Sequence, residues 1–206
     1  MPTEPSAAVL GFRPHTYWTA VVALAGRPTS PRVIERRRMV FATGTERFVF
    51  HQAAEADPGK AEPLIAATRA ATVANAAGDI ATLVADLQRD GVRVRRAVVP
   101  AGVGRGLENL EEILRAHSRI HAAEGNFYRD VIAAACEVVG LDVHRALERD
   151  LPDLVCARAG FSAALLGARV KSMGAALGPP WNEDYKLATQ AAWAWLDDGQ
   201  GQPAVE

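Results

Sequence analysis

Three apolar runs within the first 42 residues are joined by connections so short that they can only pair as antiparallel neighbours. The runs are Ala7–Phe12, Thr19–Ala25 and Arg32–Ala42. The second and third are separated by Gly26-Arg27-Pro28-Thr29-Ser30-Pro31, whose residues favour a turn or loop. Parallel neighbours need a crossover of about a dozen residues or more, so the sequence predicts an antiparallel meander here.

The hydrophobic period then changes from that of strands to that of helices. The predicted helices are Ala61–Asn75, Asp79–Arg89, Asn109–Ala123, Phe127–Val139, Ser162–Leu177 and Glu183–Leu196, and two further strands are predicted at Val92–Val99 and Leu141–Ala146. The predicted helix breaks are Gly78, Gly91, Gly125, Gly140 and Gly178-Pro179-Pro180. A meander followed by alternating helices and strands predicts an α/β fold with a mixed five-stranded sheet and helices on its faces.

The composition favours one folded domain. The 206 residues are 49% hydrophobic and 23% charged, which suits an ordinary globular core. We therefore predict a single domain over residues 7–197, with flexible termini at 1–6 and 198–206. Cys136 and Cys156 lie in apolar helical stretches, and we interpret them as buried reduced thiols rather than as a disulfide or a zinc site.

The charge balance excludes a protein-wide positive field. Lysine and arginine total 23 against 24 aspartate and glutamate residues, a net charge of −1. Binding to nucleic acid then requires a local basic patch. No apolar run approaches the roughly 18 residues of a membrane span, and the first residues lack the basic and apolar regions of a signal peptide. We predict a cytoplasmic protein without membrane contact.

One N-terminal segment resembles a known family. Leu10–Val22 is similar to the first hairpin of RuvC-type Holliday-junction resolvases, where a strand ending in Gly-Ile-Asp-Pro-Gly turns into a second strand. The order of elements over residues 7–197 resembles the same ribonuclease H-like superfamily. His121–Gly125 and Gly178–Ala188 are similar to segments of bacterial proteins of unassigned activity that share this apparent fold. The resemblance implies a ribonuclease H-like topology.

The resemblance also implies a site for two Mg²⁺ ions, from which this chain departs. Such nucleases place acids on the first strand, on the fourth strand or the helix after it, and at the start of the last helix, because Mg²⁺ prefers anionic oxygens. Arg13 stands at the first position, and Ala97–Pro100 offers no carboxylate at the second. Asp184, with Glu183 beside it, stands at the third. We predict that Arg13 pairs with Asp184 where the metals would sit.

A second candidate site involves histidines. His117 and His121 stand four residues apart, and Glu124 follows three residues later, so a continuous helix places them on one side. Two imidazoles and a carboxylate can ligate Zn²⁺, Mn²⁺ or Fe²⁺. The alternative interpretation is that they are polar side chains at a helix surface or end, with Gly125 as a break.

Other polar groups have both a structural and a functional interpretation. The acids Glu108, Glu111 and Glu112 suit the positive end of a helix capped by Asn109, although Glu112 can also supply a metal ligand. The glycine loop 102–106 places Arg105 at a helix N-terminus, where an anion can bind. Two basic clusters are either edge charges or a phosphate-binding patch: Arg36, Arg37 and Arg38, and Arg93, Arg95 and Arg96. Trp181, Trp193 and Trp195 are interpreted as core and cap residues.

We predict a degenerate, non-catalytic ribonuclease H-like protein that binds structured DNA or RNA, or a protein partner, without a cofactor. Its predicted binding residues are Arg13, His15, Arg105 and Lys186. The alternative is a divergent nuclease in which Asp184, Glu183 and a carboxylate from the segment Glu108–Glu124, such as Glu124, hold Mg²⁺ or Mn²⁺. A third hypothesis is a structural or scaffolding homodimer.

Overall fold

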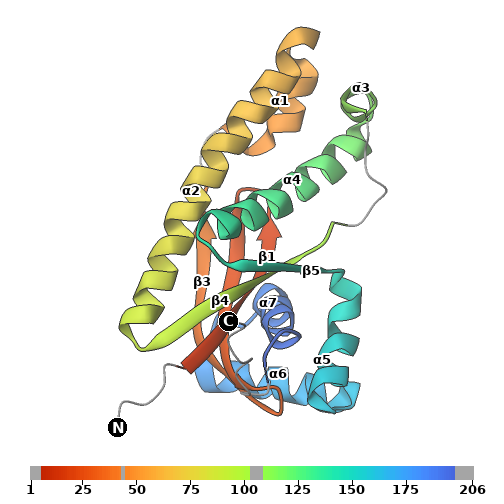
Figure 1. The fold of residues 1–206 in the computed structure, drawn as a ribbon. Coiled ribbons are helices and arrows are strands. Elements are labelled where there is room, and N and C mark those ends of the chain that lie inside the picture. The colour runs from red at the N-terminus through yellow and green to blue at the C-terminus, as the bar shows by residue number, and fades with distance from the viewer. Residues whose placement is uncertain (1–5, 43–44, 103–108, 198–206) are drawn as a thin grey trace, which may run out of the picture.

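The computed structural model describes residues 6–42, 45–102 and 109–197 (Figure 1). Its strands are β1 (Ser6–His15), β2 (Trp18–Arg27), β3 (Ser30–Val40), β4 (Val92–Pro100) and β5 (Asp142–Ala146). Its α-helices are α1 (Val49–Glu55), α2 (Ala61–Arg89), α3 (Leu110–Leu114), α4 (His117–Val138), α5 (Leu151–Ala159), α6 (Ala163–Leu177) and α7 (Glu183–Trp193). Short 3₁₀ turns are η1 (Thr45–Phe48), η2 (Pro58–Lys60) and η3 (Glu148–Asp150). Residues 1–5 and 198–206 of the predicted flexible termini lie outside the described residues.

All five strands form one sheet in the order β3-β2-β1-β4-β5. β2 pairs in antiparallel register with both β1 and β3, whereas β1, β4 and β5 are parallel. The predicted meander and the predicted mixed five-stranded α/β sheet are confirmed. Because β1, β4 and β5 run in one direction, their carboxyl ends meet at the same edge of the sheet.

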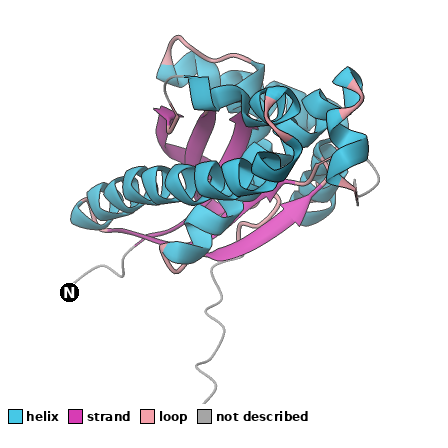
Figure 2. Cartoon of the chain, turned by 90° about the horizontal axis from the view of Figure 1, so that it is seen from above, coloured by secondary structure: helices cyan, strands magenta, loops and turns pink. Residues whose placement is uncertain are grey.

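Helices cover both faces of the sheet, as the view from above shows (Figure 2). On one face, the core of α2 and α4 includes Ala8, Leu10 and Phe12 of β1. On the other face, the core of α5, α6 and α7 includes Val9 of β1 and Val98 of β4. Successive side chains of a strand point to opposite faces, so one apolar strand can serve both cores. β1 is therefore the central strand of the fold.

Two glycines that were predicted to end helices lie inside longer ones. Gly78 is within α2 and Gly125 is within α4, so the predicted breaks at these positions are wrong. A glycine inside a helix costs only about 1 kcal/mol relative to alanine. The packing of α2 against α4 offsets that cost, because both helices bury an apolar face in the same core.

The short helix α1 carried no clear sequence signal, and α5 was indicated only as the apolar helical stretch around Cys156, without bounds. They have seven and nine residues, fewer than the roughly 11 over which a helical period is measured. Element ends also differ from the predictions: the third strand is Ser30–Val40 rather than Arg32–Ala42, and the last helix ends at Trp193 rather than Leu196. Backbone hydrogen bonds decide these ends, and apolar content is a poor guide to them.

Both cysteines are free thiols, but only one is fully buried. Burial raises the pKa of the Cys136 thiol, which keeps it protonated and unreactive. Cys156 is half-buried and packs at the margin of the core around α7. The prediction of two buried thiols is therefore correct for Cys136 only.

The segments Glu148–Ala159 and Ala163–Leu177 meet at a bend of 97°. Taken together, this bent pair has the length and apolar composition of a membrane span, whereas no single helix among the described residues does. Leu151 and Val155 of α5 and Leu166 of α6 are buried in the same core as α7. The pair thus packs on the face of the sheet that α7 covers.

Helix α7 crosses β1 in backbone contact at Gly11. A Cβ at this position would overlap the carbonyl oxygen of Ala188 and crowd the amide nitrogen of Ala192. Only glycine permits so close an approach. Further along α7, Trp193 is fully buried and its Nε1 donates a hydrogen bond to the carbonyl oxygen of Pro28 at 2.8 Å. These contacts fix where α7 lies on the sheet.

Replacing Gly11 with alanine is expected to destabilise the fold, because the added methyl group displaces α7 from β1. We expect a loss of about 3 kcal/mol or more in the free energy of unfolding, which corresponds to a fall of about 6 °C or more in melting temperature for a chain of this size. Gly78→Ala is the matched control, since nothing lies within 4 Å of a Cβ there. It should leave stability unchanged or raise it by up to about 1 kcal/mol. Equal melting temperatures for the two variants would contradict the argument.

Candidate functional site

The carboxyl edge of the parallel strands gathers the polar groups of the candidate site. Arg13 and His15 lie near and at the end of β1, on the same face of the strand as Gly11 and therefore toward α7. Pro100 ends β4, and Glu148 follows β5 in η3. In open α/β sheets, ligands bind outside the carboxyl ends of parallel strands. We therefore take this edge as the first candidate site.

Two arginines hold one carboxylate at this edge. Nη1 of Arg13 lies 3.0 Å from Oε1 of Glu148, and Nη2 of Arg129 lies 3.4 Å from the same oxygen. The side chains are mostly buried, with exposed fractions of 20%, 27% and 15% for Arg13, Glu148 and Arg129. The prediction that Arg13 pairs with Asp184 is wrong, because η3 brings a closer carboxylate from the end of β5.

Asp184 pairs with His15 instead. Nε2 of His15 lies 2.7 Å from Oδ1 of Asp184. The side-chain amide of Asn182 donates a hydrogen bond to Oδ2 of Asp184 at 3.3 Å. Asn182 also caps α7, since its side-chain oxygen accepts a hydrogen bond from the amide of Tyr185. The adjacent acid, Glu183, forms an ion pair with Lys186 one turn along α7. The structure thus brings Asp184 and His15 together and assigns each acid of this helix start a partner.

A stack of three side chains extends from His15 across the sheet. The two-residue turn at Thr16–Tyr17 pairs His15 with Trp18, and their rings are stacked with centroids 4.2 Å apart and planes 4° apart. Arg38 lies on β3, which pairs with β2, and its guanidinium is 4.5 Å from the centre of the Trp18 ring. We call His15, Trp18 and Arg38 the stacked ladder. It joins the carboxyl edge to the surface of β3.

The other predicted basic residues are mostly engaged in holding the fold. Arg36 donates hydrogen bonds to the carbonyl oxygens of Leu177, Gly178, Pro179 and Pro180 at the end of α6. Arg37 pairs with Glu35 and with Asp86 of α2, which lowers the pKa of Asp86. Arg96 pairs with Asp197, whereas Arg93 and Arg95 are exposed. Within the first basic cluster, Arg38 is the residue that stacks on Trp18 beside the site, whereas the guanidinium of Arg36 lies over the Tyr185 ring of α7.

The acids that open the predicted helix at residue 109 are surface groups. Asn109 caps α3 as predicted, by accepting a hydrogen bond from the amide of Glu111. Glu111 pairs with Arg115, and Glu112 pairs with Arg119. All four of these charged side chains are more than 40% exposed, so these pairs contribute little to stability. Arg105 and Glu108 lie outside the described residues.

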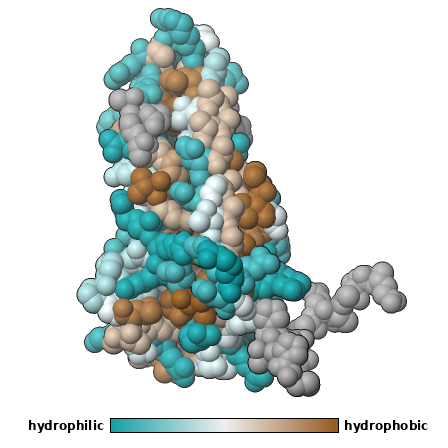
Figure 3. All heavy atoms as spheres, turned by 90° about the vertical axis from the view of Figure 1, so that its left-hand side faces the viewer, coloured by the Kyte–Doolittle hydropathy of each residue, from teal (hydrophilic) through white to brown (hydrophobic). Residues whose placement is uncertain are grey.

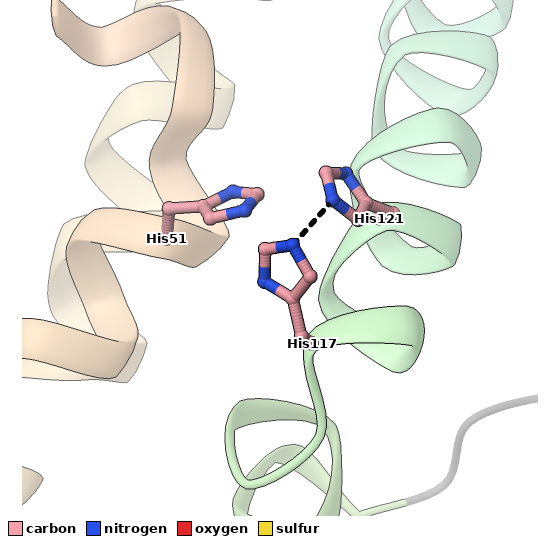
Figure 4. Close-up of side chains that lie close together, drawn as sticks. All are labelled: His51, His117 and His121. Carbon is pink, nitrogen blue, oxygen red and sulfur yellow. Dashed lines mark hydrogen bonds between the residues drawn. The ribbon is translucent and has the colours of Figure 1, made fainter.

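The second candidate site lies between α1 and α4, where three histidines converge (Figure 4). One ring nitrogen from each of His51, His117 and His121 lies within 4.8 Å of the others. The two Nε2 atoms of His117 and His121 are 2.9 Å apart. Glu124 is buried at 3% exposure, and its Oε1 lies 3.0 Å from Nδ1 of His51. The structure thus joins the predicted His117 and His121 to an unpredicted histidine, and Glu124 contacts that histidine.

The two candidate sites lie on different parts of the fold. Glu124 belongs to α4, whose buried residues share a core with α2, whereas Asp184 begins α7 on the opposite face of the sheet. The predicted catalytic combination of Asp184, Glu183 and Glu124 is therefore divided: the first two are neighbours, and Glu124 is held by His51. Sequence reasoning missed Glu148, Arg129 and His51, and nothing in their local sequence marks them.

The predicted tryptophans are placed as interpreted. Trp193 is core, and Trp181 donates its Nε1 hydrogen bond to the carbonyl oxygen of Val170 at 3.0 Å. Trp195 stacks on His144 with ring centroids 5.5 Å apart. The tryptophan of the stacked ladder, Trp18, lies in the segment Leu10–Val22, which resembles the first hairpin of RuvC-type resolvases. A two-residue turn in that segment was the signal that could have placed it beside His15.

Comparison with known proteins identifies the fold. No known family matches the sequence, and no curated protein matches it. A structure of RuvC from Thermus thermophilus superposes with a TM-score of 0.52 and 9% identity, covering 91% of this chain and 92% of the other. A structure of T. thermophilus RuvC in complex with Holliday junction substrate has a TM-score of 0.53 and 12% identity, covering 91% of each chain. At these identities the likeness shows the fold alone, which is ribonuclease H-like.

A double-mutant cycle tests the ion pairs at the carboxyl edge. We expect Arg13→Ala and Glu148→Ala to couple by about 0.5–3 kcal/mol in the free energy of unfolding. Glu148→Ala leaves two mostly buried arginines without their acid, and Arg13→Ala leaves Glu148 with only its longer contact to Arg129. Arg13→Ala and Asp184→Ala should couple more weakly, since Asp184 keeps His15. Thermal or urea unfolding of the single and double variants provides the four free energies. A stronger coupling of Arg13 to Asp184 than to Glu148 would contradict the observed pairing.

Proposed function

We propose that this protein binds the phosphate backbone of structured nucleic acid at its carboxyl edge and does not cleave it by a two-metal mechanism. The observation that carries the proposal is the Arg13–Glu148–Arg129 group, which puts two guanidiniums at the strand edge where the resemblance to RuvC-type resolvases implies a site for dications. The likeness to RuvC bound to a Holliday junction supports nucleic acid as the partner class. Both parts rest on the ribonuclease H-like fold.

The side chains at this edge do not fit two Mg²⁺ ions. Two dications about 4 Å apart require several free carboxylate oxygens and water. Glu148 is held by two arginines, Asp184 by His15 and Glu183 by Lys186. A guanidinium offers no lone pair to a metal and repels it. No catalytic step through Mg²⁺ is therefore derived for this edge.

The same side chains suit a phosphate group. With Arg13 and Arg129 positive and Glu148 and Asp184 negative, their formal charges sum to zero before any proton on His15 is counted. A site of free acids would repel phosphate without metals, whereas this one does not. Within the described part of the chain, the Nε atoms of Arg13 and Arg129 are buried without a hydrogen-bond partner. Because these two atoms are buried, a phosphate would contact the exposed parts of the two side chains, whose exposed fractions are 20% and 15%.

The stacked ladder adds groups that nucleic acids commonly engage. The Trp18 ring lies between His15 and the Arg38 guanidinium, and Arg38 is the exposed end of the stack. Unpaired bases stack on arginine guanidinium planes as well as on aromatic rings, and arginine also pairs with phosphate. The ladder therefore supports a surface that binds distorted or single-stranded nucleic acid, for which bases are accessible. Its contribution is local, in keeping with the net charge of −1 for the whole chain.

The scaffolding homodimer has weaker support. In the space-filling view of the side that carries α2, apolar residues form separate patches, and a broad hydrophilic band crosses the molecule between them (Figure 3). A stable dimer buries about 800 Å² or more per partner with an apolar centre. The divided surface in this view favours a monomeric contact with nucleic acid over a large dimer interface on that side.

The purified protein is expected not to cleave branched, duplex or single-stranded DNA, or RNA–DNA hybrids, in Mg²⁺ or Mn²⁺. The reason is that the acids at the carboxyl edge are already neutralised by basic side chains. Gel analysis of labelled substrates over a wide range of enzyme concentration checks this. Cleavage that Asp184→Asn abolishes would instead support the divergent nuclease, in which Asp184 and Glu183 hold metal.

Binding to a branched DNA is expected to depend on the stacked ladder. Trp18→Ala should weaken binding several-fold, because Arg38 loses the ring that holds its guanidinium in place, a contact of about 0.5–2 kcal/mol. Arg38→Ala should weaken it and reduce the slope of log Kd against log salt by about one. Fluorescence anisotropy at several salt concentrations measures both quantities.

The matched control for that experiment is Arg93→Ala, which removes the same charge from an exposed position near the amino end of β4. It should leave affinity and salt slope close to those of the wild type. Equal losses in Arg38→Ala and Arg93→Ala would show non-specific electrostatic binding. Unchanged affinity in Trp18→Ala would remove the stacked ladder from the interface.

A further inference from the structure

We propose that His51, His117 and His121 bind one divalent transition-metal ion, preferentially Zn²⁺, and that the bound ion ties α1 to α4. This inference is independent of the proposed function, because it concerns a different part of the fold and involves none of the residues at the carboxyl edge. His51 comes from α1, and the other two histidines come from the first turns of α4. Figure 4 shows the three rings pointing toward one another across the gap between these helices.

The spacing of the rings needs only a small adjustment to hold an ion. Two Zn–N bonds of 2.0–2.1 Å at a tetrahedral angle place their nitrogens about 3.3 Å apart. The Nε2 atoms of His117 and His121 are 2.9 Å apart, so they would separate by a few tenths of an ångström. The centroid of the His51 ring lies 5.3 Å from that of His117 and 4.9 Å from that of His121. His117 and His121 are exposed, which leaves their rings free to make this adjustment.

Glu124 orients the third histidine toward the other two. An ionised carboxylate only accepts hydrogen bonds, so Nδ1 of His51 donates to Oε1 of Glu124 at 3.0 Å. That bond fixes the tautomer and leaves Nε2 of His51 with its lone pair for a metal. Metal-ligating histidines in proteins are commonly held by a carboxylate in this way. At 3% side-chain exposure, Glu124 is a buried acid whose position is hard to explain as a chance surface contact.

The donor set selects the class of ion. Three neutral imidazoles suit Zn²⁺, Cu²⁺, Ni²⁺ or Fe²⁺, whereas Mg²⁺ and Ca²⁺ require oxygen ligands. Of these, Zn²⁺ readily accepts three histidines in tetrahedral geometry and keeps a fourth position for water. The carboxylate of Glu124 is engaged with His51 and serves to position it, so the predicted ligand set of His117, His121 and Glu124 is replaced by three histidines.

The ion would add a cross-link between α1 and α4, which already meet through Phe50 and Phe127 in the shared core. α1 has seven residues and follows η1 directly. Val49, Phe50 and Ala53 bury its apolar side, and His51 lies beside them. A metal bond from His51 to α4 would add a cross-link whose strength depends on metal concentration. The proposal therefore predicts a local effect on α1 as well as a binding stoichiometry.

The experiment measures Zn²⁺ binding to the full chain after treatment with a chelator. We expect one Zn²⁺ per chain by calorimetric titration and by metal analysis after dialysis. Zn²⁺ should also raise the melting temperature and slow amide hydrogen exchange in α1. Co²⁺, used as a spectroscopic probe, should give the visible absorption of a tetrahedral nitrogen site. A wild-type chain that retains no Zn²⁺ after dialysis would overturn the proposal.

Three variants and a control separate this site from adventitious binding. His51→Ala and His121→Ala should each lose the ion on dialysis, and Glu124→Gln should weaken binding about 10–100-fold while retaining all three ligands. His144→Ala removes a histidine from β5 and should bind Zn²⁺ as the wild type does. Equal affinity in the wild type and His51→Ala would mean that only His117 and His121 bind the ion, which overturns the proposal. Should His51→Ala fail to fold, the single variants His121→Ala, at an exposed position, and Glu124→Gln still test the proposal.

Discussion

The backbone contact between β1 and α7 at Gly11 is the constraint on which the rest of the structure depends. β1 is the central strand and is covered on both faces, so its position sets both cores. The missing side chain at Gly11 lets α7 lie directly on this strand. That crossing puts the start of α7 beside the end of β1, where Asp184 meets His15. A bulkier residue would move the helix and separate the two.

The chemistry of the carboxyl edge follows from which charges that geometry brings together. In a nuclease of this fold, the edge needs unpaired acids because the metals supply the positive charge. Here Arg13 and Arg129 supply it, and they neutralise Glu148 without an ion. Under the proposed function, the edge can contact phosphate through these arginines, while its paired acids do not suit Mg²⁺. In that proposal, binding and cleavage depend on different parts of the same charge arrangement.

Much of the fold could be predicted from the sequence, but only part of each site. The short connections of the meander and the later change of period led to the correct sheet, and the departure at Arg13 was visible in one segment. The sequence did not show that Arg13 pairs with Glu148, because Glu148 lies in a three-residue turn. It did not show Arg129 either, because an arginine inside a helix has no distinctive spacing. His117 and His121 were found by their spacing within one helix. His51 was not found, because it lies in a helix of seven residues, which is too short to show a helical period in the sequence.

By itself, the sequence determined the five strands and most of the helical segments, because hydrophobic period and turn chemistry act over a few residues at a time. It did not reveal α1, or that α2 and α4 continue through Gly78 and Gly125. It also determined which residue types are present at the strand ends, and hence that Arg13 cannot ligate a metal. Only the tertiary structure decided the partners. It pairs Glu148 with Arg13, Asp184 with His15, and Glu124 with His51. The physical reason is that an ion pair or a metal site depends on distances of a few ångströms between groups far apart in the chain, and packing alone sets those distances.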